Sequence, residues 1–198
     1  MKEEIKLRKL IVSEFVSIDG VMEAPGGEPG YKHSGWVLDF PQDSEQGKYK
    51  LDEVLDADAL LLGRVTYEGF AAAWPSRRDE AGFADKMNSM PKHVVSSTLD
   101  DLAWNNSSLL TGDVAEAVST LKQQDGGDIL VAGSRTLVQT STSTVLSTST
   151  GSWLFPVVLS SGRRLCPDAA AEKALLKLVD SRTFDSGVAV YTYHPARA

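Results

Sequence analysis

The stretch Leu130-Val131-Ala132-Gly133-Ser134-Arg135-Thr136-Leu137 decides how the rest of the chain is interpreted. It continues from Ile129, so an apolar run of strand length ends in small and polar residues. Thr136-Leu137-Val138 then indicates the start of a helix. A buried strand that passes through glycine into a helix is typical of α/β proteins, whose ligands bind beyond the carboxyl ends of the strands.

Three further apolar runs end in small or polar residues in the same way. Leu10–Val12 leads into Ser13, Leu60–Leu62 ends at Gly63, and Val94-Val95 ends at Ser96-Ser97-Thr98. These runs do not alternate polar with apolar residues, which favours strands buried on both faces of a mainly parallel sheet.

Helical patterns lie between the strands. Residues 44 to 57 place Leu51, Val54 and Leu55 at helical spacing. Residues 114 to 124 follow Asp113, which can cap a helix, and Gly126 can end it. We therefore expect an α/β fold, a single domain whose mostly parallel central sheet is flanked by helices.

The last part of the chain changes character. Residues 176 to 182 and 188 to 193 are strand-like and are joined near residues 185 to 187. They predict a C-terminal antiparallel hairpin at one edge of the sheet. Residues 24 to 35 are rich in Gly and Pro, and we expect them to form a long loop over the site.

Composition narrows the class of protein. The chain has 198 residues and a formal charge of −7, which suits one domain and gives no electrostatic case for nucleic-acid binding. Its longest apolar run is too short to span a membrane. A single cysteine, Cys166, indicates a reducing compartment, so we expect a cytoplasmic protein in which Cys166 is a small buried side chain.

Metal chemistry and several common enzyme classes have little support. His33, His93 and His194 are scattered, without the spacing of paired metal ligands, so no metal is expected. The glycine patterns of Rossmann and P-loop proteins are absent, as is the elbow motif of serine hydrolases.

The predicted strand ends instead suit a phosphorylated ligand. They carry Gly63-Arg64-Val65-Thr66, Ser96-Ser97-Thr98 and Ala132-Gly133-Ser134-Arg135-Thr136. Glycine allows close backbone approach, helix N-terminal N–H groups bind phosphate oxygens, and arginine adds forked donors. Each element alone also fits a strand end, a turn or a surface charge; their recurrence at three strand ends favours the ligand.

The substrate side offers fewer candidates. Asp19 follows the first strand in Ser17-Ile18-Asp19-Gly20, where it can orient a substrate, or relay a proton if burial raises its pKa. Equally, it can be a turn aspartate before Gly20. Trp36 and Phe40 can stack on a planar heterocycle, or pack in the core or a lid.

These motifs together resemble the dihydrofolate-reductase-like superfamily, and more closely the reductase domain of bacterial riboflavin biosynthesis proteins. The boxes that carry the resemblance are VSIDG (16–20), GRVTYEGF (63–70), VVSSTL (94–99), LVAGSRTL (130–137) and FPVVLSSGRRL (155–165). The resemblance runs over residues 8–194 and leaves 1–7 as an N-terminal extension.

The resemblance implies NADPH as cofactor and hydride transfer to a C=N or C=O carbon of a small heterocycle, pterin-like or pyrimidine-like. Asp19 would be the substrate-facing carboxylate, with Trp36 and Phe40 nearby. The residues that would border the cofactor are Phe15, Ser17, Met22, Gly63, Arg64, Thr66, Ser96, Ser97, Thr98, Ala132, Gly133, Ser134, Arg135, Thr136 and Leu137. Relatives commonly pair, which makes the late strands the natural interface of a homodimer.

Two alternatives remain. The first is the riboflavin-pathway 5-amino-6-(5-phosphoribosylamino)uracil reductase, whose substrate needs a further phosphate site; the sequence shows no clear spare basic cluster for it. The second is a non-catalytic NADP(H)-binding protein.

Residues 140 to 152 are nearly all Ser and Thr, where relatives carry a buried strand of L-V-D-E-L type. The composition favours a flexible loop, and Thr makes a strand the alternative. Preserved length with altered composition suggests a compensated pair of frameshifts, or else an ordinary divergent loop. In both cases hydroxyls replace buried apolar surface, which lowers stability.

Overall fold

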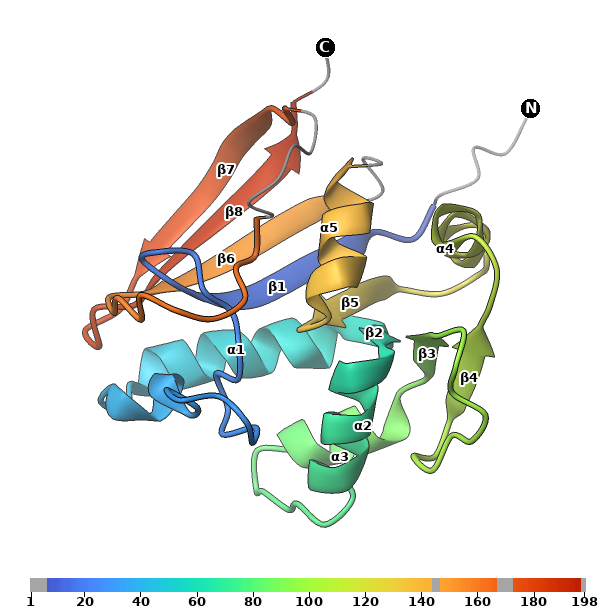
Figure 1. The fold of residues 1–198 in the computed structure, drawn as a ribbon, viewed down its shortest axis with the longest axis horizontal. Helices are drawn as coiled ribbons and strands as arrows, with labels where there is room; N and C mark the ends of the chain where they lie inside the picture. Colours follow the sequence, from blue (N-terminus) through green and yellow to red (C-terminus); the bar gives the residue numbers. More distant parts are fainter. Residues whose placement is uncertain (1–6, 144–146, 167–172, 197–198) are drawn as a thin grey trace.

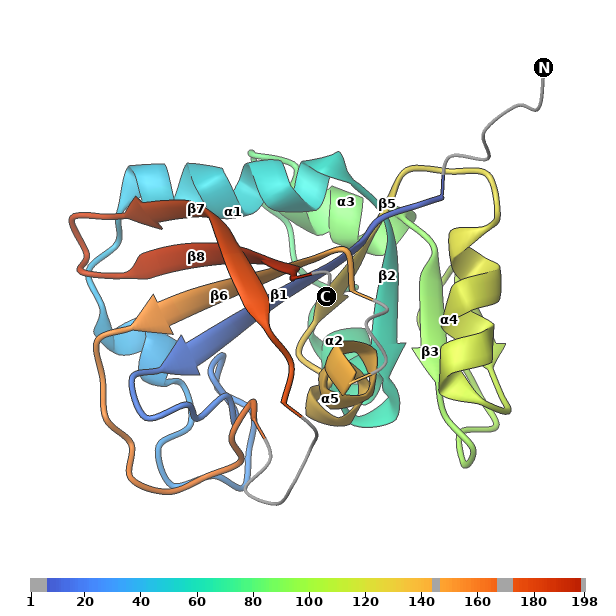
Figure 2. The ribbon, with the colours of Figure 1, turned by 90° about the horizontal axis from the view of Figure 1, so that it is seen from above.

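A central sheet of eight strands organises the chain in a computed structural model, which describes residues 7–143, 147–166 and 173–196. The strand order is β4-β3-β2-β5-β1-β6-β8-β7, and Figure 1 and Figure 2 show the strands side by side. The strands are β1 (Leu10–Ser17), β2 (Ala57–Gly63), β3 (Lys92–Val95), β4 (Ser107–Leu110), β5 (Asp128–Ala132), β6 (Ser149–Phe155), β7 (Leu176–Thr183) and β8 (Ala189–Pro195).

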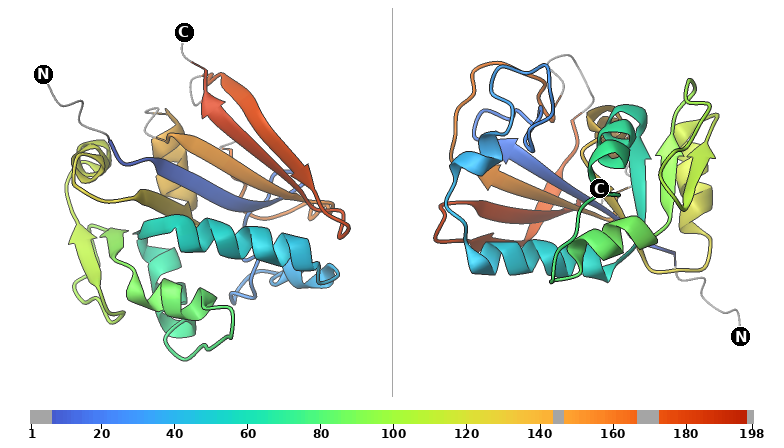
Figure 3. Two further views of the ribbon diagram at one scale, coloured as in Figure 1. Left: turned by 180° about the vertical axis from the view of Figure 1, so that it is seen from behind. Right: turned by 90° about the horizontal axis from the view of Figure 1, so that it is seen from below.

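The pairing pattern confirms the predicted architecture. Strands β1 to β6 pair in parallel, whereas β8 pairs antiparallel with both β6 and β7. The β7–β8 hairpin forms one edge of the sheet and β4 the other (Figure 3). The predicted single α/β domain with a C-terminal hairpin is therefore correct.

Helices cover both faces of the sheet, which explains why the strands read as unbroken apolar runs. Leu60 and Leu62 pack with α1 (Ser44–Asp56), α2 (Arg64–Ala73) and α3 (Phe83–Ser89). Leu61, between them, packs on the opposite face with α4 (Val114–Lys122) and α5 (Arg135–Ser143). A third cluster, built on Trp153 and Phe155 of β6, extends the core toward the hairpin and includes the 3-10 helix η1 (Trp36–Asp39).

The predicted helix starts are correct at α1 and α4. The carboxylate of Asp113 accepts the N–H of Glu116, and Asp43 caps α1 by accepting from Glu45 and Gln46. Helix α4 ends at Lys122, before Gly126. Between β2 and β3 lie two helices, α2 and α3, and β4 lies between β3 and α4.

The Ser/Thr-rich segment adopts regular structure on both sides of residues 144–146, which lie outside the described residues. Helix α5 runs to Ser143, and β6 begins at Ser149 between β1 and β8. The expectation of a loop is wrong for residues 149–152 and the strand alternative is correct, because two neighbouring strands supply backbone partners. The frameshift hypothesis concerns the coding DNA and stays a prediction.

The single cysteine does not lie where the sequence analysis placed it. Cys166 is exposed, so the expectation that it is buried is wrong; it follows the segment that packs on α5 rather than lying within the core.

Residues 24–35 form the expected loop. Within the described residues, no helix is long and apolar enough to cross a membrane.

Candidate functional site

The neighbouring strands β2 and β5 end at the same edge of the sheet, and a helix begins directly after each. Helix α2 starts at Arg64 and α5 at Arg135. From this point α5 rises on one side of the sheet and α2 descends on the other (Figure 1). The first N–H groups of a helix have no intrahelical partner, so two helix N-termini converge where the sequence predicted a phosphate site.

Two hydrogen bonds and close packing join these two turns into one unit, and a third hydrogen bond ties the α5 turn to β1. The Gly63 N–H donates to Ser134 Oγ at 2.8 Å, and the Ser134 N–H donates to Thr66 Oγ1 at 2.8 Å. Gly133 and Ser134 have φ of +66° and +62°. A Cβ at Gly133 would lie 2.9 Å from Thr66 Cγ2, so this turn needs glycine for both conformation and space. We call Gly63, Thr66, Gly133 and Ser134 the double turn.

The third of these bonds comes from Glu14, in the middle of β1. Its Oε2 accepts the Gly133 N–H at 2.9 Å, and the residue is 2% exposed. Its Oε1 has no hydrogen-bond partner among the described residues. Burial raises the pKa of Glu14 well above its usual value, and Lys50 partly opposes this rise. The sequence analysis missed Glu14, although a glutamate inside an apolar strand was the available signal.

Three other residues that were predicted to border the cofactor, Arg64, Thr136 and Ser96, follow the ends of β2, β5 and β3. The Arg64 guanidinium is half exposed, 3.4 Å from Glu68, and Thr136 is the second residue of α5. Ser96 follows β3, the next strand over, where its Oγ accepts the N–H groups of Thr98 and Leu99 and so forms a turn. The strand ends therefore come together as predicted, while several of the polar groups already bind one another.

The first strand contributes less exposed surface than expected. Ser17 is fully buried: its hydroxyl donates to Asp19 and accepts the Val21 N–H. Met22 is 8% exposed. Phe15 packs edge-on against Trp153 and Phe155, in the cluster that faces α1. These residues shape the end of β1 through packing.

Asp19 holds a loop. Its carboxylate accepts hydrogen bonds from Ser17 Oγ at 2.7 Å, the Leu159 N–H at 3.1 Å and the Ser160 N–H at 2.9 Å. The Ser17 hydroxyl is the largest cause that lowers the pKa of Asp19, and the Leu159 and Ser160 N–H groups add to it, while burial opposes them in part. The raised pKa that a proton relay would require is absent, so the geometry matches the turn-aspartate alternative.

Trp36 and Phe40 belong to the core that faces α1. Trp36 is 2% exposed, its Nε1 donates to the Glu23 carbonyl, and its ring lies 5.4 Å edge-on from Phe155. Trp36 therefore matches the core-packing alternative and not the substrate-stacking one, because its ring is covered by protein. Phe40 is half-buried and also packs edge-on against Phe155, at 5.2 Å.

A basic cluster that the sequence analysis did not find lies beside α5. The Arg135 Nε donates to the Arg164 carbonyl, and the Arg164 Nε donates to the Asp19 carbonyl. Arg163 pairs with Glu23 at 2.9 Å. The three arginines come from segments that only the fold brings together, so their spacing in the chain gave no signal.

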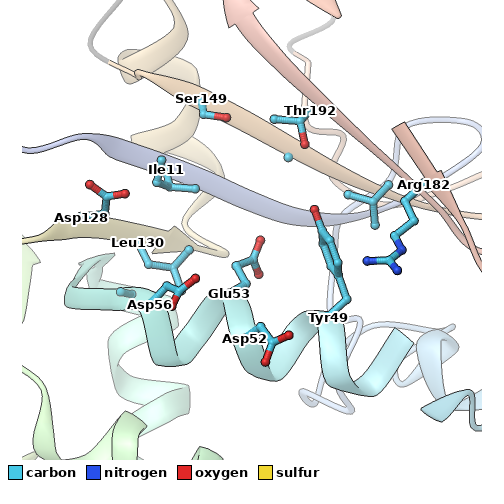
Figure 4. A pocket seen from close by; sticks show the side chains of 13 residues that line it. Ile11, Tyr49, Asp52, Glu53, Asp56, Asp128, Leu130, Ser149, Arg182 and Thr192 are labelled. Atoms are coloured by element: carbon cyan, nitrogen blue, oxygen red, sulfur yellow. The ribbon is translucent and has the colours of Figure 1, made fainter. Parts of the chain in front are cut away.

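A cavity of about 410 Å³ lies elsewhere, between α1 and the first residues of β1, β5 and β6 (Figure 4). Asp52, Glu53 and Asp56 of α1 face it across from Arg182. No predicted site residue lines it. It opens near the strand starts, away from the double turn.

Comparison with known proteins identifies the fold. The chain is 28% identical over 197 residues to the uncharacterised Bacillus subtilis (strain 168) protein YyaP, with 98% of each chain covered. A Shewanella sp. PV-4 protein assigned to riboflavin biosynthesis superimposes with a TM-score of 0.73 at 20% identity, covering 96% of this chain and 99% of that one.

Dihydrofolate reductase from Enterococcus faecalis, in complex with NADP(H) and RAB-propyl, has a TM-score of 0.55 at 14% identity, covering 96% of this chain and 97% of that one. These similarities confirm the dihydrofolate-reductase-like fold. A model of the RibD C-terminal domain family matches residues 8–190, more than half of the chain. This protein belongs to the RibD C-terminal domain family.

Proposed function

We propose that this protein is an NADPH-dependent reductase that transfers hydride to a C=N or C=O carbon of a small pterin-like or pyrimidine-like heterocycle. The observation that carries the proposal is the double turn, which brings the N-termini of α2 and α5 together at one edge of the sheet, where Arg64 and Arg135 begin these helices. Membership of a family named for a riboflavin biosynthesis domain, and a fold shared with a dihydrofolate reductase, support a reductase.

The residues at this edge of the sheet suit a dinucleotide diphosphate. The first N–H groups of a helix have no intrahelical partner and bind phosphate oxygens well, and the missing Cβ at Gly133 lets Thr66 and the α2 turn pack close to the start of α5. Arg64 supplies a charge-assisted donor that no buried partner neutralises, because its contact with Glu68 is solvent-exposed. Ser96, Ser97 and Thr98 lie beyond β3, on the side where we place the adenosine end.

When bound, the reduced nicotinamide supplies the hydride. The protein's part is to bind, orient and exclude water. Phe15, Ser17 and Met22 form the closed end of β1 against which we place the nicotinamide. Asp19 is a positioning residue in this proposal, because its ionised carboxylate holds residues 159 and 160 rather than donating a proton.

The first experiment titrates the protein with NADPH and with NADH while following tryptophan fluorescence, since the chain has four tryptophans. We expect saturable binding with tighter binding of NADPH. The same protein is then mixed with NADPH and candidate heterocycles while reduced-nicotinamide absorbance is followed. Lack of any NADPH response would contradict the proposal.

A second candidate is the riboflavin-pathway 5-amino-6-(5-phosphoribosylamino)uracil reductase. The cluster of Arg135, Arg163 and Arg164 favours it, since this cluster offers the cationic groups that a substrate phosphate needs. Turnover of a ribosylaminopyrimidine phosphate but not of dihydrofolate would support this candidate. NADPH binding without oxidation in any substrate mixture would instead support a non-catalytic NADP(H)-binding protein.

We further propose that the protein is a cytoplasmic homodimer that pairs through β7. All eight residues of this edge strand are exposed, including Leu176, Leu178 and Val179 at 43–48%. Exposed apolar edge strands favour pairing with a second chain, and a two-fold axis would continue the sheet. Sedimentation of the wild type and of Leu178→Lys tests this, with a monomeric wild type as the contradicting result.

A further inference from the structure

Glu14 is a buried carboxyl group with an unusual set of neighbours. It lies in β1 between β5 and β6, and its Oε2 accepts the Gly133 N–H of the double turn. The residue is 2% exposed, while Oε1 has no hydrogen-bond partner among the described residues. A buried polar atom without a partner costs free energy, so its retention at this position calls for a role.

Within the part of the chain that the structure describes, no charged group forms an ion pair with Glu14. Lys50 of α1 contacts Glu53 and donates to Ser13 Oγ at 2.9 Å, so its ammonium already has partners. Glu53 itself opposes ionisation of Glu14. On the other face, α5 begins with Arg135, whose Nε donates to the Arg164 carbonyl. Burial therefore dominates and raises the pKa of Glu14, which favours the neutral acid.

The position of Glu14 links its protonation to the double turn. An ionised Glu14 places a negative charge one hydrogen bond from Gly133, next to the helix N-termini where we place the cofactor diphosphate. A protonated Glu14 removes that charge and turns one carboxyl oxygen into a donor. An anionic ligand at these N-termini is thus opposed by the ionised form and tolerated by the neutral form.

We propose that Glu14 is a positioning residue that couples proton binding to cofactor binding, so that NADPH binds to the protein with Glu14 protonated and draws a proton onto it. The inference rests on the proposed function for the identity of the ligand. By linkage, a ligand that prefers the protonated form raises the pKa of Glu14. Affinity is then greatest below the pKa of the free protein and falls as pH rises through it, up to the pKa of the complex.

Calorimetric titration with NADPH tests this directly, in buffers that differ in ionisation enthalpy, between pH 6 and 9. We expect the wild type to take up protons on binding and to lose affinity by up to roughly tenfold for each pH unit within the linked range. Glu14→Gln is permanently neutral, so it should bind at least as well and show no uptake from this site. The 2′-phosphate of NADPH titrates equally with both proteins and cancels in the comparison.

Two further variants serve as controls. Thr66→Val removes the acceptor of the Ser134 N–H without touching a titratable group, so it should weaken binding by the same factor at every pH. Lys50→Met removes the cation that favours ionised Glu14, so it should move the affinity profile to higher pH. This second shift keeps the test decisive if Glu14→Gln does not fold.

The outcomes separate the two proposals. Equal proton uptake by the wild type and Glu14→Gln, or an affinity profile that Lys50→Met leaves unmoved, would overturn the role of Glu14 while NADPH binding stands. No NADPH binding by the wild type at any pH would overturn the proposed function as well.

Discussion

Thr66 and Gly133 are in contact across the ends of two neighbouring strands: a Cβ on Gly133 would lie 2.9 Å from Thr66 Cγ2 and 3.0 Å from Oγ1. No side chain larger than hydrogen fits unless Thr66 moves. This contact fixes how close the α2 and α5 turns come to each other, and therefore how far apart the two helix N-termini lie at the proposed cofactor site.

Gly133→Ala should therefore weaken NADPH binding and lower the free energy of unfolding. The positive φ of Gly133 costs an alanine on the order of 1 kcal/mol, and the steric clash adds to this. Thr66→Ser removes Cγ2 but keeps the hydroxyl that accepts the Ser134 N–H. In a double-mutant cycle measured by denaturant unfolding, it should recover part of the loss. Strict additivity of the two changes would contradict the contact.

Arg64→Ala should raise the dissociation constant of NADPH by about tenfold, because a charge-assisted contact to phosphate is lost. The effect should shrink at high salt, since Arg64 is exposed. Glu68→Gln is the matched control: it removes the partner of Arg64 and should leave binding unchanged or slightly tighter. Fluorescence titration at two salt concentrations measures both. A loss of affinity in Glu68→Gln as large as in Arg64→Ala would argue against a phosphate contact.

Asp19→Asn should loosen the loop that follows β6. The folded-state pKa of Asp19 is lowered, so its contribution to stability is present above the unfolded pKa and is lost as pH falls through the folded value. At neutral pH we expect a loss on the order of 1 kcal/mol, because three hydrogen bonds to a charged acceptor are weakened at a partly exposed site. Unfolding at pH 7 and pH 3 measures it.

Turnover of the same variant separates structure from catalysis. A positioning role predicts a changed KM with an unaltered pH profile of kcat. Complete loss of kcat in a folded Asp19→Asn protein would restore Asp19 as a catalytic residue.

The buried Lys92 should give the protein a distinctive alkaline stability profile. Its Nζ donates to the carbonyls of Asn88 and Asn105 and lies 4.2 Å from the centre of the Trp104 ring, and burial lowers the pKa of Lys92 to about 8. The unfolded chain holds this proton up to about 10.5. Between these values the native state binds fewer protons, so the free energy of unfolding from this group rises with pH.

Lys92→Met isolates that contribution. The difference in unfolding free energy between the wild type and the variant should change with pH between 8 and 10.5 and stay flat below about 7. Denaturant titrations at each pH provide the measurement. Parallel profiles for the two proteins would show that Lys92 does not titrate in this range.

Gly151→Ala should stabilise the protein by about 0.5–1 kcal/mol, since glycine within a strand carries an entropic cost. Gly151 lies in β6 between β1 and β8, and an added Cβ would meet only ordinary contacts, the nearest at 3.5 Å from the Val12 carbonyl oxygen. Thermal unfolding reports the gain. Gly133→Ala is the natural contrast, because the same substitution there meets both strain and contact.

The sequence predicted what is encoded locally. Gly63, Gly133 and the apolar runs before them mark strand ends, because strand burial and turn conformation depend on neighbouring residues in the chain. The capping role of Asp113 could be predicted because it depends on the N–H of Glu116, only three residues later in the chain.

What could not be predicted depends on distant partners. Glu14 becomes part of the candidate site only through Gly133, 119 residues later in the chain. From the sequence alone, the Trp36 ring is a candidate for stacking on a ligand, but in the fold Phe155 packs against it. The basic cluster arises because the side chain of Arg135, at the start of α5, donates to the backbone carbonyl of Arg164. Residues 149–152 form a strand despite their composition, since β1 and β8 both pair with them.

The place of β1 in the sheet has a consequence for how the chain is made. Although β1 precedes the other strands of this sheet in the chain, both of its neighbours, β5 and β6, follow residue 127. During synthesis, β1 therefore leaves the ribosome before β5 and β6 exist. Its apolar residues have no strand to pair with until those residues have also emerged. Such long-range pairing folds slowly and favours chaperone contact during synthesis. A nascent chain stopped before residue 149 would lack β6, the partner on one side of β1.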